Sequence, residues 1–539
     1  MNKHLKPIRL VTGFLTVGAW TLISRVFGFI RDVLIAAFLG AGPVAEAFLI
    51  AFSLPNMFRR LFAEGAFNTA FVPIFAKKLQ ADDAPRVFAQ DAFSALGSVL
   101  IVLTLIAQLA MPWMVLAMAS GFTGDIRFDL AVDYGRVIFI YVVFISLAAL
   151  LAGILNANGL FAAAAAAPTL LNIILIGCMG AAFASFSEET AVTNPRISSF
   201  ELHVGFFLIW GVVAAGLAQF GLVWWATSKI GFSLRPKLPR LTPELRRLAI
   251  IAAPAMLSGG VVQVNLLVGR QVGSFFDGAI AWLSFADRLY QLPLGVVGVA
   301  IGIVLLPELS RKLQTNDEIG SREALSRATE LALALTIPAT AALLVISEPL
   351  VSVLFERGAF QSDDVSATAL AVAVYGVGLP AFVLQKVFQP LYFAREDTKT
   401  PFYYALVSMF INAAVAVTAA YFLGFIGAAI GTTVAGWSML WLLTRGTKKM
   451  GKAARFDSQV LKRIQKMILA TCLMSGVLFF LAWSLDPIFA MSGWRWLALV
   501  TLILSGITVY SFFGHVLGAF RIADIQKALR RSSTTRHEV

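Results

Sequence analysis

The chain has 539 residues, of which 59% are hydrophobic and only 14% charged, and its formal net charge is +13. A soluble globule carries roughly 25% charged residues, so this composition excludes a soluble class and indicates a polytopic membrane protein. The two cysteines and four histidines are too few and too dispersed for a disulfide framework or a metal site, and we expect neither.

Apolar runs of about 20 residues or longer predict 14 membrane-spanning helices. The first run is too long for the core of a signal peptide, so we expect it to be a retained span. The runs lie near residues 10–39, 44–75, 88–116, 130–155, 159–185, 202–227, 248–273, 280–310, 327–353, 363–393, 401–421, 425–444, 467–485 and 496–517.

The positions of the basic residues predict the orientation of these spans. If both termini are cytoplasmic, 30 of the 43 Lys and Arg lie in cytoplasmic segments and four lie in outer segments. This asymmetry is the positive-inside pattern of membrane proteins. The net charge therefore reports orientation, with attraction to anionic lipids as a second effect, and we expect no nucleic-acid partner.

The two longest connections between spans divide the chain into groups of six, six and two spans. The endings of spans two and eight resemble each other around Pro73 and Pro307, although such endings also recur by chance. The sequence thus predicts an all-α fold of two six-helix lobes, related by a pseudo-two-fold axis along the membrane normal, plus two C-terminal helices. The predicted domains are an N-lobe (1–229), a C-lobe with its preceding linker (230–447), the last two spans (448–517) and a basic cytoplasmic tail (518–539).

Charged residues lie inside the first, second and eighth predicted spans. A charge near the middle of a bilayer costs several kcal/mol, so it is rare unless it lines a wet cavity. The arginines exceed the acids by one, which favours an anionic ligand, and a guanidinium suits phosphate because its planar fork binds two oxygens. The alternative is a set of internal ion pairs that only orient broken helices. The charges are Arg25, Arg31, Asp32, Glu46, Arg59, Arg60, Glu64, Asp287 and Arg288.

Spacing predicts how some of these charges pair. Arg60 and Glu64, four residues apart, can pair directly, and Arg25 can be bridged to Asp32 along one face. Breaks near the charges, at Gly28, Pro55 and Pro293, are candidate hinges, and a bend at Gly28 would let Arg25 and Arg31 face the same way. The roles of Arg270 and Lys386, also within spans, stay open between structural and functional.

No enzyme signature is present: the chain has neither a GxxxxGK[ST] phosphate loop nor a cluster of metal-ligand residues. We therefore expect no catalytic residue and no cofactor. Transport, if it is driven, must draw on the membrane potential or an ion gradient.

Two blocks, Ser24–Asp32 and Leu54–Phe67, closely resemble the opening of the MurJ/MviN family of lipid II flippases. Further matches follow in order along the chain. They are Pro168–Asn172, Ala286–Leu289, Leu354–Phe360 and Ala394–Pro401.

The resemblance implies the fold of the multidrug/oligosaccharidyl-lipid/polysaccharide exporter superfamily, with a groove for a lipid tail at the last two spans. It implies a location in the bacterial inner membrane and a role in peptidoglycan synthesis, with membrane lipids and cell-wall synthesis proteins as partners. Arginines matching Arg25, Arg31, Arg59 and Arg288 are required in that family, and we expect them to bind the substrate pyrophosphate. Supporting cavity residues would be Ser24, Asp32, Glu46, Asn56, Arg60, Glu64 and Asp287.

The mechanism expected from this resemblance is alternating access, in which the two lobes rock about a site that holds the lipid II pyrophosphate. Glu46 stands where the family has an aspartate, and Gln291 stands where some relatives carry an acid. One alternative is a flippase for another polyprenyl-pyrophosphate oligosaccharide of the O-antigen type. A membrane glycosyltransferase is less well supported, because the outer loops leave little room for an active site.

Overall fold

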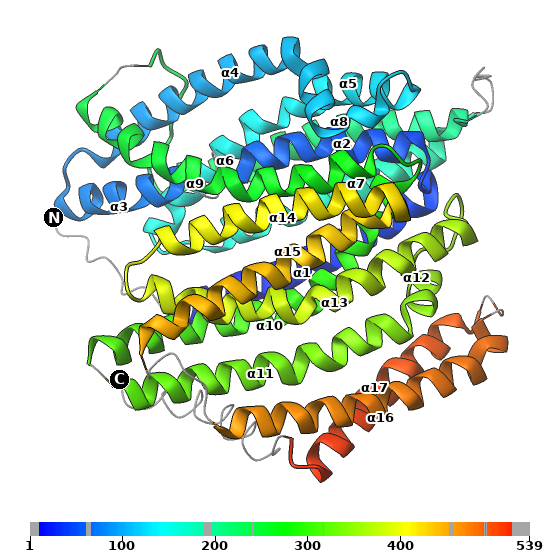
Figure 1. The fold of residues 1–539 in the computed structure, drawn as a ribbon. Helices are drawn as coiled ribbons and strands as arrows, with labels where there is room; N and C mark the ends of the chain where they lie inside the picture. Colours follow the sequence, from blue (N-terminus) through cyan, green and yellow to red (C-terminus); the bar gives the residue numbers. More distant parts are fainter. Residues whose placement is uncertain are drawn as a thin grey trace. The chain divides into compact units, whose positions relative to one another are not determined.

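The helices form a polytopic all-α bundle in the part of the chain that the structure describes. This computed structural model describes residues 10–60, 66–187, 196–239, 242–315, 317–451, 458–489, 491 and 493–519, and no strand occurs among them. Figure 1 shows the fold. The α-helices are α1 (Leu10–Leu39), α2 (Pro43–Arg59), α3 (Ala66–Ala81), α4 (Pro85–Met118), α5 (Ile126–Phe139), α6 (Tyr141–Ala157), α7 (Ala162–Ser185), α8 (Ser199–Lys229), α9 (Pro243–Gly273), α10 (Ala279–Gln314), α11 (Glu318–Val345), α12 (Ser347–Phe355), α13 (Ser362–Phe393), α14 (Lys399–Leu423), α15 (Ile426–Thr447), α16 (Ser458–Phe489) and α17 (Arg495–Val516).

The predicted all-helical membrane fold is confirmed. Every predicted apolar run coincides with one or two helices, and ten described segments are long and apolar enough to cross a membrane. Helices are expected here because lipid offers backbone N–H and C=O groups no partner outside the chain. The total of 14 spans and the pseudo-two-fold axis stay predictions.

Three of the predicted runs each correspond to two helices. Run 44–75 comprises α2 and α3, run 130–155 comprises α5 and α6, and run 327–353 comprises α11 and α12. Apolar runs do not reveal such breaks, because the residue between two helices can itself be apolar, as Ile140 and Ile346 are.

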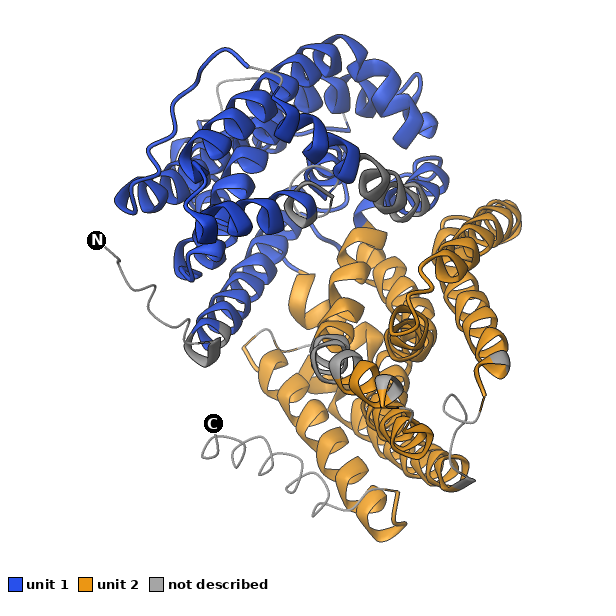
Figure 2. Cartoon of the chain, turned by 90° about the vertical axis from the view of Figure 1, so that its left-hand side faces the viewer, with its two compact units in different colours: residues 1–281, 357–361 blue, residues 282–356, 362–539 orange. Residues whose placement is uncertain are grey.

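Packing divides the chain into two compact units (Figure 2). Unit 1 comprises Met1–Ala281 and Arg357–Gln361, and unit 2 comprises Trp282–Glu356 and Ser362–Val539. In unit 1, α1 packs on α7, α2 on α5, and α9 on α3 and α4. The prediction placed α9 in the C-lobe, but packing does not test the membrane lobes, so the predicted domains stay a prediction.

A short segment after α12, Arg357–Gln361, packs on the end of α1 within unit 1. The backbone N–H of Ala359 donates to the carbonyl of Ala37 at 2.8 Å. Gly358 has φ +59, and a Cβ there would lie 2.1 Å from the Ala37 oxygen. This close backbone approach accounts for the glycine in the Leu354–Phe360 motif.

We predict that Gly358→Ala destabilises the protein much more than Gly124→Ala. Both glycines have a positive φ, +59 and +80, but a Cβ at position 124 meets nothing within 4 Å. Both variants therefore carry the left-handed backbone penalty of about 1–2 kcal/mol, and only Gly358→Ala adds a backbone clash. Thermal unfolding of the purified variants measures the difference, and equal midpoints would contradict the packing described above.

In unit 2, α13 packs on α15 and α11, and the pair α16–α17 lies beside α11 and α12 (Figure 1). Two ion pairs connect α16 and α17 to α11 and to the end of α12. Arg463 of α16 contacts Glu330 of α11 at 2.5 Å, and Arg495 of α17 contacts Glu356 at 2.8 Å. The last two predicted spans are therefore anchored to unit 2 by charge as well as by apolar packing.

Candidate functional site

Arg31 on α1 is buried and held by three side-chain hydrogen bonds. Its Nε and Nη2 donate to Asp32 Oδ1 at 3.0 and 2.6 Å, and its Nη1 donates to Asn172 Oδ1 at 2.9 Å. Only 5% of Arg31 and 6% of Asp32 is exposed. The guanidinium is thus fixed in position by a neighbouring acid and by α7.

Asn172 of α7 forms hydrogen bonds with two residues of α1, Arg31 and Ser24. Besides accepting from Arg31, it donates through Nδ2 to the Ser24 carbonyl at 3.0 Å and to Ser24 Oγ at 3.4 Å. A Cβ at Gly28 would lie 3.4 Å from the same Nδ2, so the glycine permits the close approach of α7. The helix continues through Gly28 without interruption, and this residue serves a packing contact here.

Arg25 differs sharply from Arg31. Its side chain is exposed, and it makes no hydrogen bond or ion pair with any part of the chain that the structure describes. The sequence suggested a bridge from Arg25 to Asp32, but Asp32 is ion-paired with its neighbour Arg31. Arg25 thus keeps its donors for another partner.

Four residues of the predicted site, Pro55, Asn56, Arg59 and Arg60, lie at the C-terminal end of α2. α2 continues through Pro55 to Arg59, and Asn56 Nδ2 donates to the Phe52 carbonyl at 2.9 Å. Arg59 is half-buried and Arg60 is exposed. Glu64 lies outside the described residues, so its predicted pairing with Arg60 stays a prediction.

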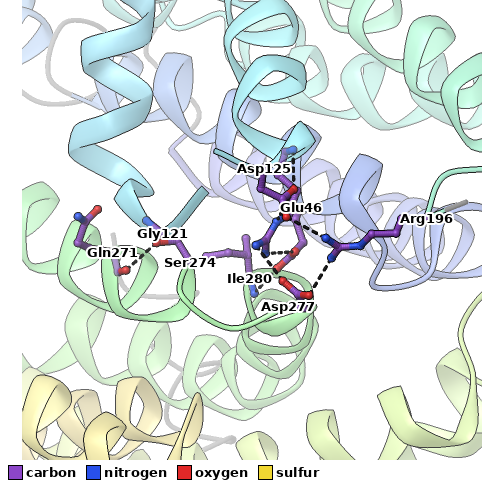
Figure 3. Close-up of polar contacts among 9 residues, drawn as sticks. Glu46, Gly121, Asp125, Arg196, Gln271, Ser274, Asp277 and Ile280 are labelled. Atoms are coloured by element: carbon purple, nitrogen blue, oxygen red, sulfur yellow. Dashed lines mark hydrogen bonds and ion pairs between the residues drawn. The ribbon is translucent and has the colours of Figure 1, made fainter. Parts of the chain in front are cut away.

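Glu46, predicted to support the cavity, is a buried member of a polar network in unit 1 (Figure 3). It is 1% exposed and accepts from Arg127 Nη1 at 3.0 Å and from the Ile280 backbone N–H at 3.0 Å. Arg127 is also within 2.8 Å of Asp277 and 3.2 Å of Asp125. The network thus joins α2 and α5 to the turn between α9 and α10.

The same turn is held by further polar contacts. Arg196 bridges Asp125 at 2.9 Å and Asp277 at 2.7 Å. In Figure 3 a second group of contacts lies to one side, where Gly121 N–H donates to Ser274 Oγ at 3.0 Å. Two independent sets of contacts therefore fix the end of α9.

Asp125 also caps α5 by accepting from the Arg127 backbone N–H at 2.9 Å. Partial burial alone would raise the pKa of Asp125, but that hydrogen bond and the charges of Arg127 and Arg196 lower it overall. Because the pKa of Asp125 is lowered in the folded state, its ionised carboxylate stabilises the fold at pH values above its unfolded-state pKa. That stabilisation is lost as the pH falls through the folded-state pKa.

Sequence reasoning missed several members of these networks. Arg127 was counted among the charges of the outer loops, yet it is 4% exposed. Asn172 appeared only within a family motif. Arg127 lies 81 residues from Glu46 and 150 residues from Asp277 in the chain, and no local spacing signals these contacts. The one local signal is a basic residue, Arg127, two positions after the capping Asp125.

The eighth predicted span contributes Asp287 and Arg288 from α10 of unit 2. Asp287 accepts from the side-chain amide of Gln291, and Arg288 is exposed. α10 continues through Pro293. Because Arg288 belongs to unit 2 and the other three site arginines to unit 1, the convergence of all four stays a prediction.

Of the two residues left open, Arg270 is half-buried near the end of α9, and Lys386 is exposed on α13. The exposure of Lys386 between two prolines of α13 is compatible with either role.

Known proteins match this chain over most of its length. Residues 35–494 match the family model described as lipid II flippase MurJ. A probable lipid II flippase MurJ of Rhizobium meliloti (strain 1021) is 43% identical, over 97% of each chain. A probable lipid II flippase MurJ of Vibrio cholerae is 34% identical, over 96% of this chain and 98% of the relative.

Two solved structures support the fold. One, titled as lipid II flippase MurJ in an inward closed conformation, has 24% identity and a TM-score of 0.75, covering 93% of this chain and 98% of that one. An inward-facing multidrug transporter of the MATE family and MOP superfamily has 14% identity and a TM-score of 0.58, covering 80% and 95%. At these identities the two structures carry information on the fold alone.

Proposed function

The chain belongs to the lipid II flippase MurJ family, and from this membership we propose that it moves lipid II from the inner to the outer leaflet of the cytoplasmic membrane. The family is one of transporters, and the chain is a multi-pass membrane protein. The cargo would be an undecaprenyl-pyrophosphate-linked peptidoglycan precursor, which is a lipid-linked oligosaccharide.

One observation in the described residues supports pyrophosphate binding most directly. Helix α1 contains two arginines in different environments. Arg31 is buried and held by Asp32 and Asn172, whereas Arg25 is exposed six residues earlier. An exposed guanidinium within an apolar helix costs free energy unless it meets an anion or water. A pyrophosphate would supply that anion.

We assign the pyrophosphate contacts to Arg25, Arg59 and Arg288, with Arg31 completing the set. Each charge-assisted bond supplies about 1.5–3 kcal/mol, which is enough to hold a head group whose polyprenyl tail never leaves hydrocarbon. The tail would lie beside α16 and α17. Rocking of the two predicted lobes would then expose the site to the other leaflet.

The proposal also covers the direction of lipid II transport and the energy source that drives it. Both termini are assigned to the cytoplasm from the positive-inside pattern, and the membrane potential or an ion gradient would drive the cycle. Membrane lipids surround the chain, and cell-wall synthesis proteins are the proposed partners.

Complementation tests the proposal. The chain is expressed in a bacterium depleted of its own lipid II flippase, and we expect it to restore growth and cell shape. A flippase for O-antigen precursors, expressed to the same level, should not restore them. Failure of the chain to rescue growth, although it is inserted in the membrane, would contradict the proposed cargo.

A further inference from the structure

A polar cavity of about 330 Å³ lies between the beginnings of α11 and α16 in unit 2, and its lining includes none of the four arginines assigned to the pyrophosphate. Figure 1 shows these two helices side by side. The polar lining includes Arg322, Ser326, Arg327, Glu330, Gln459 and Arg463.

Basic groups exceed acidic ones in this cavity. Three arginines line it against two acids, Glu323 and Glu330. Arg463 pairs with Glu330 at 2.5 Å and Arg327 with Glu323 at 2.9 Å. A guanidinium has five N–H donors, and one carboxylate engages at most two of them in a bidentate pair. The paired arginines therefore retain donors for the oxygens of a second anion.

Apolar side chains are exposed beside the cavity. Ile319, which also lines it, is 75% exposed. On α16, Leu469 and Leu473 are 51% and 39% exposed, and Leu473 lies 14 residues after Gln459, on nearly the same helix face. In a membrane protein such a row of side chains contacts acyl chains. A charged cavity thus adjoins a lipid-facing stripe.

We propose that this cavity binds the phosphate of an anionic glycerophospholipid, whose acyl chains lie along the exposed face of α16. Basic pockets between membrane helices on the cytoplasmic side recognise such head groups. The orientation proposed above puts the beginnings of α11 and α16 on that side. A bound lipid would bridge α11 and α16 in the same place as the Arg463–Glu330 ion pair.

The test measures binding of phosphatidylglycerol to the purified full-length chain in detergent by native mass spectrometry. Arg322→Gln/Arg463→Gln should weaken binding about 30-fold, because each basic residue near the site contributes about fivefold. Arg322→Gln alone, which keeps the Arg463–Glu330 pair, should weaken it about fivefold. Arg136→Gln, which removes an exposed arginine from α5, should leave the affinity unchanged.

Two further ligands distinguish the source of the phosphate. Phosphatidylcholine, which is zwitterionic, should bind at least tenfold more weakly than phosphatidylglycerol, and inorganic phosphate should not displace the lipid. Equal affinity of Arg322→Gln and the unchanged chain would overturn the site, as would equal binding of phosphatidylcholine. Displacement by millimolar inorganic phosphate would overturn the lipid assignment. None of these readouts depends on lipid II transport, so their failure is distinct from failure of the proposed function.

Discussion

Replacing Arg25 with alanine should abolish complementation of a flippase-depleted strain while the protein remains folded in the membrane. Arg25 is exposed and has no partner among the described residues, so its loss removes no internal contact that the structure shows. If it holds the pyrophosphate, its loss removes about 1.5–3 kcal/mol of charge-assisted bonding, or roughly 10- to 150-fold in affinity. Arg59→Ala and Arg288→Ala should give the same growth defect.

The matched control is Arg136→Ala. Arg136 is also an arginine within a membrane helix, but its side chain is 46% exposed and is paired with Asp133 at 3.5 Å. Its loss should leave growth intact. If the Arg25→Ala, Arg59→Ala and Arg288→Ala variants all supported growth as well as the control, at the same membrane level, the assignment of the pyrophosphate contacts to these arginines would be refuted.

Arg31→Ala should differ from these three variants by lowering stability as well as activity. Its guanidinium offsets the charge of buried Asp32 and bonds to Asn172. The variant leaves a carboxylate in the interior without that partner. The thermal unfolding midpoint of Arg31→Ala should therefore be measured together with growth. A growth defect in this variant is attributed to substrate binding only if the midpoint is unchanged.

Arg127→Ala should destabilise the protein by roughly 3–5 kcal/mol, which is the usual cost of breaking a buried ion pair from one side. The variant leaves Glu46, 1% exposed, without its guanidinium, whereas Asp125 and Asp277 keep their ion pairs with Arg196. Glu46→Gln should cost less, because its carbonyl oxygen can still accept from the Ile280 N–H.

Thermal unfolding in detergent measures both effects, and a double variant, Glu46→Gln/Arg127→Ala, measures their coupling. We expect the double variant to be more stable than the sum of the two single changes implies. Arg136→Ala again serves as control, since an exposed pair contributes about 0–1 kcal/mol. A loss in Arg127→Ala no larger than in that control would show that the network around Glu46 is not structural.

The sequence predicted the helical elements well because a bilayer leaves the backbone few choices. The first apolar run, 10–39, coincides with α1. The seventh and eighth predicted spans, which contain charged residues, each lie within a single helix, α9 and α10. Breaks such as Ile140 were not predictable, because the residue is apolar and carries no turn signal. Family resemblance supplied the MurJ assignment, which the comparisons confirm.

The contacts of the charged side chains were harder to predict. Adjacent residues point about 100° apart on a helix, so the spacing favoured Asp32 as a partner of Arg25. The long Arg31 side chain instead reaches the neighbouring carboxylate. Glu46 was expected to face a cavity, and its bonds to Arg127 and Ile280 depend on tertiary packing that no sequence period encodes.

A leaflet-translocation assay with purified components tests the central claim most directly. The chain is reconstituted into vesicles with lipid II, and the fraction of lipid II that reaches the opposite leaflet is followed over time. We predict transfer that depends on the protein, is lost in Arg25→Ala and is kept in Arg136→Ala. Transfer no faster than in protein-free vesicles, or an Arg25→Ala variant as fast as the unchanged chain, would contradict flipping through an arginine-bound pyrophosphate.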